Sequence, residues 1–128
     1  MTAPGFERER PAQGPYIRGY GEGGFLVGDE AHPALLLTPE RALAWTPPPL
    51  AELSAADLAP LLALDPLPEF LILGTGAAMA FAPRALVRAL DERGVGIEAM
   101  DSRAAARTWS LLRAEERWIA AAVLPLEK

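Results

Sequence analysis

The sequence contains no cysteine and a single histidine, His32. The absence of cysteine excludes a disulfide framework, a thiolate metal site and a cysteine nucleophile, and it is typical of a reducing compartment. A Ser-His-Asp triad would depend on His32 alone, which lies in the turn-like segment DEAHP at 29–33. Asp29, Glu30 and His32 are residue types that can bind a metal, but a histidine in a turn is far more often simply exposed to solvent. We therefore expect neither a metal site nor triad chemistry.

Basic charge and long apolar runs are also scarce. Lys128 is the only lysine, and the formal net charge is −5. Because phosphate binding needs a basic face, this charge argues against a nucleic-acid partner. No apolar run reaches the roughly 18 residues of a membrane span, and the N-terminus lacks the basic-then-apolar order of a secretory signal. We expect a soluble, cytoplasmic protein without a transmembrane segment.

The chain has 128 residues, the length of one domain. A domain of this size buries a hydrophobic core large enough to be stable without a disulfide or a bound metal. Residues 1–14 carry proline, glycine and charges without an apolar period, so we predict a flexible N-terminal arm before a single domain over 15–128. The three prolines at 47–49 exclude a helix or central strand and predict a stiff surface connection. In the first half, residues 16–20 and 24–27 read as two short strands of a hairpin, 34–37 is a third apolar run, and a fourth segment is centred on 42–45.

Strands and helices alternate in the second half. The predicted elements are a helix at 54–64, a strand at 70–73, a helix with Pro83 at its first position and Gly94 as its cap, a strand at 95–100, a helix from 101 or 102 to about 116 and a strand at 118–124. This order implies right-handed βαβ crossovers and a parallel core. We predict an α/β fold, a three-layer single domain with a mixed, about five-stranded central sheet and helices on both faces.

Gly74, Thr75 and Gly76 directly follow the buried strand at 70–73. They match the start of the dinucleotide fingerprint G-x-G-x-x-G, but Met79 occupies the position of the third glycine. This bulky side chain argues against nicotinamide or flavin binding, and we predict no cofactor. With Pro83 at the first helical position, Ala82 would be the helix cap, and alanine leaves the first N–H groups unsatisfied. These groups and the loop amides of residues 75–78 would suit a small anion, or equally water.

Asp101 and Ser102 follow the next parallel strand, so this turn and the glycine loop should emerge side by side at one edge of the sheet. Arg107 lies one helical turn after Arg103; it would hold the acid group of a ligand or, as we favour, belong to a solvated helix face. Thr108 has a hydroxyl, but the sequence shows no candidate base that would activate it as a nucleophile. The candidate pocket therefore comprises Gly74, Thr75, Gly76, Ala77, Asp101, Ser102, Arg107 and Thr108. We assign none of them a catalytic role.

Residues 77–82 are unusually apolar for a loop. Large apolar side chains at such positions most often belong to the core, and an exposed group of them would suit a partner protein. We take Met79 and Phe81 as the candidate partner surface.

These motifs resemble a conserved family of small proteins that includes mitochondrial complex I assembly factor 3 and the adipogenesis-associated homologue. The resemblance covers roughly residues 16–126 and is carried by LGTG at 73–76, EAMDS at 98–102, Ala104, Ala105, Arg107, Thr108, Leu112, Glu115 and Arg117. It implies a three-layer fold around a mixed five-stranded sheet. It also implies that no enzymatic activity is established for the bacterial members, and that the eukaryotic relatives assist the assembly of the respiratory NADH dehydrogenase.

The sequence departs from this family at four positions. The family often has cysteine at Ala106, tyrosine at Trp109, asparagine at Ser110 and glycine at Glu116. Any thiol chemistry of the family is therefore absent here, and a hydrogen bond from the asparagine amide would be lost or replaced by one from a hydroxyl.

Two functional hypotheses follow. The first is a non-catalytic binding or assembly-factor-like protein, linked to respiratory complex I, whose partner is a complex subunit or another assembly factor. The alternative is a metabolic enzyme or sensor that binds a small anion or nucleotide in the same cleft. We favour the first, so an enzyme is the less expected outcome.

Overall fold

The computed structural model describes residues 14–126. Its strands are β1 (Ile17–Gly21), β2 (Gly24–Val27), β3 (Glu30–His32), β4 (Leu35–Leu37), β5 (Ala42–Ala44), β6 (Phe70–Gly74), β7 (Gly96–Met100) and β8 (Ala120–Val123). Its helices are α2 (Ala59–Leu62), α3 (Arg84–Asp91) and α4 (Ser102–Ala114), with two short 3-10 helices, η1 (Leu50–Glu52) and η2 (Ala55–Leu58).

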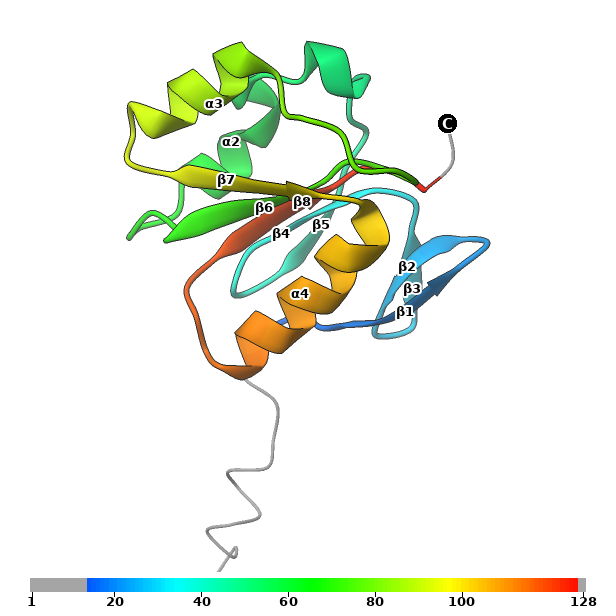
Figure 1. Cartoon of the computed structure of the whole chain (residues 1–128). Helices are drawn as coiled ribbons and strands as arrows, with labels where there is room; N and C mark the ends of the chain where they lie inside the picture. Colours follow the sequence, from blue (N-terminus) through cyan, green and yellow to red (C-terminus); the bar gives the residue numbers. More distant parts are fainter. Residues whose placement is uncertain (1–13, 127–128) are drawn as a thin grey trace, which may run out of the picture.

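Five strands form a mixed central sheet in the order β5-β4-β8-β6-β7. Strand β6 pairs in parallel with both β7 and β8, and β4 pairs antiparallel with β8 and β5. Helices α2 and α3 cover one face and α4 covers the other, while a small sheet, β1-β2-β3, packs beside α4 (Figure 1). The predicted three-layer α/β fold with a mixed five-stranded sheet is confirmed.

The alternation of side chains along the central strands divides the core into two layers. Leu71 and Leu73 of β6 pack with Leu86 and Leu90 of α3. Ile72, between them in the chain, faces the other way and packs in the layer that contains Trp109 of α4. Because both faces of the strand are covered, every position from Leu71 to Leu73 is apolar, as expected for a parallel strand in the middle of a three-layer domain.

The helix and strand bounds predicted from the sequence mostly agree with the observed bounds within about two residues. Two predictions are corrected. Pro83 has the extended ψ angle of 139° and is the N-cap of α3 rather than its first residue, so Ala82 is not the cap. His32 lies at the end of strand β3, opposite Phe25 of β2, rather than in a turn. The three residues of β3, Glu-Ala-His, include no large apolar side chain, unlike those of β4, and this is why β3 was not predicted.

Of the predicted N-terminal arm over residues 1–14, only Gly14 belongs to the described part of the chain. Gly14 has a φ of +102° and lies against the backbone of Pro39, where a Cβ would overlap the carbonyl oxygen. Any other residue at this position would have to move away from Pro39. Within residues 14–126, no helix combines the length and the apolar content that crossing a membrane requires.

A surface ion pair connects the segments that lead into β6 and β8. Two guanidinium nitrogens of Arg117 donate hydrogen bonds to Oε1 of Glu69, at 3.0 and 2.8 Å. The backbone N–H of Glu69 donates to the carbonyl of Trp118 at 2.8 Å. The hydrogen bond from Arg117 holds the pKa of the Glu69 carboxyl below its ordinary value. A lowered pKa means that the folded state favours the ionised Glu69 carboxyl. The resulting stabilisation of the folded state is present above the pKa that Glu69 has in the unfolded chain, and it is lost as the pH falls through the pKa that Glu69 has in the folded protein.

We predict that the substitution Arg117→Gln returns the pKa of Glu69 upward to the ordinary range, because it removes the charged donor. An NMR titration of the side-chain carboxyl carbons would measure this change. Arg88→Gln, on the exposed side of α3, is the matched control and should leave the pKa of Glu69 where it is. An unchanged Glu69 titration in Arg117→Gln would contradict the assignment of the shift to this pair.

Candidate functional site

The candidate site lies at the edge of the sheet where β6 and β7 end. Gly74 and Met100 are paired in the parallel register of the two strands, so the chain leaves both at the same place. The backbone N–H of Thr75 donates to the carbonyl of Met100, and that of Ser102 donates to the carbonyl of Gly76, both at 2.8 Å. The expected side-by-side placement of the glycine loop and the start of α4 is therefore present.

Ser102 is fully buried at this edge and ties three segments together. Its Oγ accepts a hydrogen bond from the N–H of Gly76 at 2.8 Å and donates one to the carbonyl of Leu124 at 2.7 Å. A Cβ on Gly74 would lie 2.8 Å from the same Oγ, which is too close for any side chain. The roles of Gly74 and Ser102 are thus structural: they hold the strand ends against α4 and do not face an open surface.

Thr75 shapes the glycine loop through its hydroxyl. Its Oγ1 donates to the carbonyl of Ala78 at 2.8 Å, lies 3.1 Å from the carbonyl of Met100, and accepts from the N–H of Ala80 at 3.1 Å. The amides of Thr75 and Gly76 are also committed, to Met100 and to Ser102. These two N–H groups are therefore not available for the anion that the sequence suggested.

The loop Thr75–Ala78 forms one wall of a half-open pocket of about 1160 Å³. The opposite side is built by the end of β3 and the segment after β5, and the chain after β8 contributes the rest. The lining residues are Ala31–Ala34, Ala44–Leu50, Thr75–Ala78 and Leu124–Leu126. They are mostly apolar or small, with Trp45 the largest, and none is Lys, Arg, Asp or Glu. Such a lining suits an apolar ligand or peptide segment better than a charged one.

The remaining candidate residues point elsewhere. The Asp101 carboxylate caps α4 by accepting the N–H of Ala104 at 2.9 Å. Arg107 is exposed and lines a second depression, between α4 and β1, while Thr108 lines neither. The residues that the sequence grouped into one cleft are therefore divided. Successive residues of α4 are rotated by the helix, so Arg107 turns away from the glycine loop even though Ser102 contacts it.

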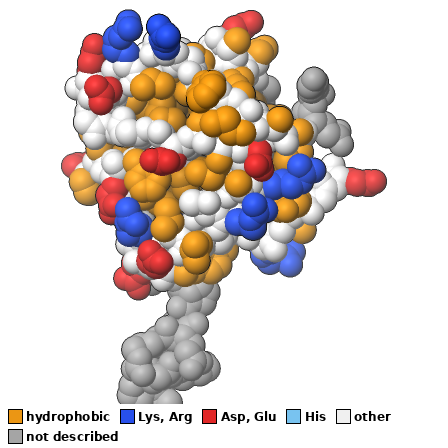
Figure 2. Space-filling model, in the orientation of Figure 1, with side chains coloured by type: hydrophobic (Ala, Val, Ile, Leu, Met, Phe, Trp, Pro, Cys, Tyr) orange, Lys and Arg blue, Asp and Glu red, His pale blue; other side chains and the backbone are white. Residues whose placement is uncertain are grey.

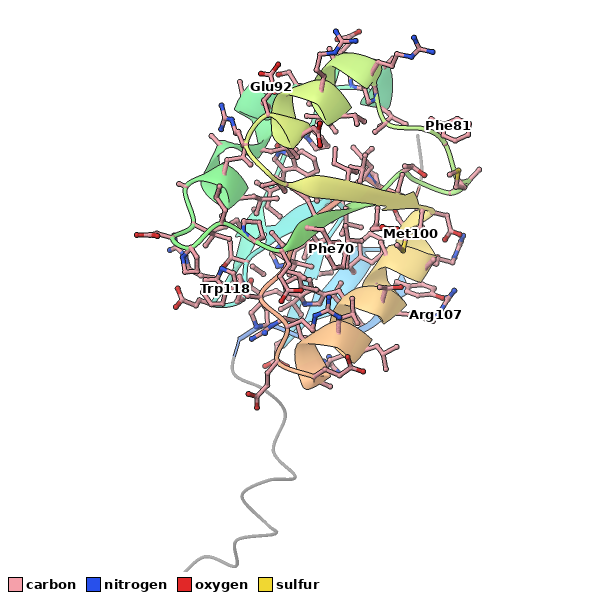
Figure 3. All side chains as sticks on the ribbon, turned by 60° about the vertical axis from the view of Figure 1, so that its left-hand side comes forward. Phe70, Phe81, Glu92, Met100, Arg107 and Trp118 are labelled. Atoms are coloured by element: carbon pink, nitrogen blue, oxygen red, sulfur yellow. The ribbon has the colours of Figure 1, made fainter. Side chains whose placement is uncertain are left out.

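Met79 and Phe81 are both exposed, with 52% and 85% of their surface accessible. They belong to the loop that continues from the pocket wall toward α3. Figure 3 shows the Phe81 ring at the outer end of this loop, directed away from the sheet. Large apolar side chains this exposed gain nothing from the fold of their own chain, and they follow in sequence the residues that line the apolar pocket, so we keep them as the candidate partner surface.

The sequence did not identify the far wall of the pocket, which contains Trp45 and the prolines 47–49. The triple proline was interpreted only as a connection. The available signal was a large aromatic residue, Trp45, two residues before a segment whose backbone the prolines make rigid.

The described residues offer little acid-base or metal chemistry. Residues 14–126 contain no group of three or more His, Asp or Glu side chains arranged to hold a metal ion. His32 lines the pocket, and its Nε2 lies 3.5 Å from Oε1 of Glu30, a strand neighbour in β3. Within the described range, the hydroxyls of Thr38, Thr75, Ser102 and Ser110 donate to backbone carbonyls and not to this imidazole. The arrangement can bind an apolar group by burial, and it presents no nucleophile and base in contact.

Comparisons with known proteins agree with the fold. A family model described as protein of unknown function (DUF498/DUF598) matches residues 17–124. An uncharacterized protein of Rhodobacter capsulatus is 36% identical over 124 residues, covering 96% of this chain and 90% of the relative. NADH dehydrogenase (ubiquinone) 1 alpha subcomplex assembly factor 3 of Danio rerio is 28% identical over 125 residues, covering 97% of this chain and 72% of the relative. The crystal structure of a Bordetella parapertussis protein is similar with a TM-score of 0.76 and 34% identity, covering 91% of this chain and 98% of that one.

We predict that Ser102→Ala lowers the free energy of unfolding by about 2 kcal/mol, because it leaves the buried N–H of Gly76 and the buried carbonyl of Leu124 without their partner. Chemical denaturation followed by circular dichroism would measure the change. Thr108→Ala is the control: it also removes a hydroxyl from α4, but Thr108 is only half-buried, and we expect a change of about 0.5 kcal/mol or less. Equal losses in the two variants would contradict the role given to Ser102.

Proposed function

Because the chain belongs to the family of proteins of unknown function DUF498/DUF598, whose model spans residues 17–124, we propose that it is a non-catalytic binding protein that assists the assembly of the respiratory NADH dehydrogenase. Relatives named as assembly factors of that enzyme support the proposal; the Danio rerio protein matches 97% of this chain. The family resemblance inferred from the motifs at 73–76 and 98–102 is thereby confirmed. The partner we propose is a subunit of the respiratory complex or another assembly factor.

One structural observation carries the proposal: Phe81 stands 85% exposed on a loop that borders an apolar pocket. Burying a phenylalanine side chain against a partner is worth about 1.5–3 kcal/mol, enough to anchor an interface. The pocket beside it would receive an apolar side chain or a short extended segment from the same partner. Trp45 and Leu126 supply its large apolar surfaces.

The alternative, a small-anion or nucleotide-binding enzyme or sensor, has weaker support. The pocket lining contains no Lys or Arg, and the amides of Thr75 and Gly76 are bonded within the protein. Anion sites normally combine free backbone N–H groups with a helix N-terminus or a basic side chain. We therefore place a protein segment, rather than a metabolite, in this pocket.

We predict that Phe81→Asp weakens capture of the native partner at least about tenfold, as expected for an aromatic anchor at an interface. The measurement is co-purification of the tagged protein with subunits of the membrane complex, quantified by mass spectrometry. Leu67→Asp is the matched control, since Leu67 is also exposed, at 39%, but lies before the start of β6, at the other end of that strand. If Phe81→Asp and Met79→Asp both fold and both retain the complex subunits, the proposed surface is wrong.

A thermal-shift screen tests the alternative separately. We expect ATP, NADH and inorganic phosphate to raise the melting temperature by less than about 1 °C, because a ligand at saturating concentration stabilises the native state by several kcal/mol only when it binds there. A rise of several degrees with one of these compounds, abolished by Thr75→Val, would favour the metabolite-binding role instead.

A further inference from the structure

A second depression lies between β1 and α4, away from the apolar pocket. Tyr16, Arg18 and Tyr20 form its β1 side, and Arg107, Ser110 and Leu111 form its α4 side. We call it the β1–α4 groove. It has a volume of about 560 Å³, within the range of sites that hold a peptide side chain or a small ligand.

The two sides of the groove are fixed to each other by side-chain hydrogen bonds. Oγ of Ser110 accepts from the N–H of Ile17 and donates to its carbonyl, both at 3.3 Å. The indole N–H of Trp109 donates to the carbonyl of Pro15 at 3.1 Å. Because both backbone groups of Ile17 are taken by Ser110, an incoming chain cannot add to β1 as another strand at that position. At Ile17, recognition must therefore use side chains instead of strand pairing.

The groove has the opposite charge to the protein. The chain carries 17 acidic and 12 basic residues, for a formal net charge of −5. Arg18 and Arg107 line the groove, and no acidic residue does. Arg103, one helical turn before Arg107, adds a third cation 5.7 Å from the centre of the Tyr20 ring. Figure 2 shows basic side chains gathered on the side of the molecule where α4 and the small sheet lie.

The arginines differ in what they contact. Nε of Arg18 donates to the carbonyl of Gly28 at 2.8 Å, and Arg103 lies over Tyr20, so both are positioned by the protein. Arg107 is exposed and has no hydrogen bond, ion pair or ring contact with any residue of the described range. Figure 3 shows it on the outer side of α4. Its guanidinium can thus pair with a carboxylate through two parallel hydrogen bonds without breaking an existing contact.

We propose that the β1–α4 groove binds an acidic segment of a partner protein. A carboxylate of that segment pairs with Arg107, a second one with Arg18, and an apolar residue between them packs on Leu111. Leu111 is 63% exposed, so it gains from being covered. The proposal goes beyond the assembly role: it names the chemistry of a second contact, on elements separate from the Phe81 loop.

The charge and shape of the groove favour a peptide over the other anionic macromolecules. A concave site of this size matches a chain with side chains that project into it, whereas a lipid surface meets a protein along a flat or convex face. The net charge of −5 opposes both an anionic membrane and nucleic acid at long range, but it leaves a local contact with a short acidic segment possible.

Fluorescence anisotropy with the purified full chain tests the proposal. The probe is a labelled peptide with the sequence EELEELEE, and its lysine counterpart KKLKKLKK is the negative control. We expect saturable binding of the acidic peptide that weakens with salt, because charge pairs at a surface are screened. Arg107→Glu should raise the dissociation constant at least about tenfold, which corresponds to about 1.4 kcal/mol.

Arg88→Glu is the matched variant, since it makes the same change of charge at an exposed position of α3 and should leave the affinity unchanged within about twofold. Equal weakening by Arg107→Glu and Arg88→Glu would overturn the groove as the site. So would the absence of saturable binding up to about 1 mM peptide. Binding to vesicles of phosphatidylcholine and phosphatidylglycerol that is lost in Arg107→Glu, without binding of the peptide, would replace the protein partner by a membrane. The assay needs no respiratory complex, so its outcome is independent of the Phe81 co-purification.

Discussion

The buried hydroxyl of Ser102 is the contact on which the edge of the sheet at the ends of β6 and β7 depends. It joins the N–H of Gly76, after β6, to the carbonyl of Leu124, after β8, from the first residue of α4. Buried donors and acceptors are costly to leave unpaired, so this pair of hydrogen bonds strongly favours one arrangement of the three segments. The wall of the apolar pocket and the start of α4 both take their positions from it.

The sequence predicted the parts of this edge that follow from local pattern. The unbroken apolar run of β6 identified a strand covered on both faces, and the βαβ order then placed Gly76 beside the start of α4. It also predicted that the following helix begins at Asp101 or Ser102; Asp101 is the cap and accepts the N–H of Ala104.

The rest depends on long-range pairing that no local pattern contains. Trp45 and the prolines 47–49 reach the pocket because β4 pairs antiparallel with both β8 and β5, which brings the end of β5 to the edge where β6 ends. Arg107 was grouped with the glycine loop because it is near Asp101 in the chain. The face that it occupies is decided by the burial of Ala105 and Trp109 against the sheet, which turns Arg107 toward β1 instead.

The three consecutive prolines in the pocket wall have a consequence for the kinetics of association. Each proline ring fixes one backbone dihedral before any partner arrives, so this wall loses little conformational freedom when the pocket is filled. Glycine-rich receptor loops, by contrast, must be ordered during the encounter. A partner would therefore meet a receptor whose shape already exists on one side, and its rate of capture would be set by diffusion and orientation more than by rearrangement of that wall.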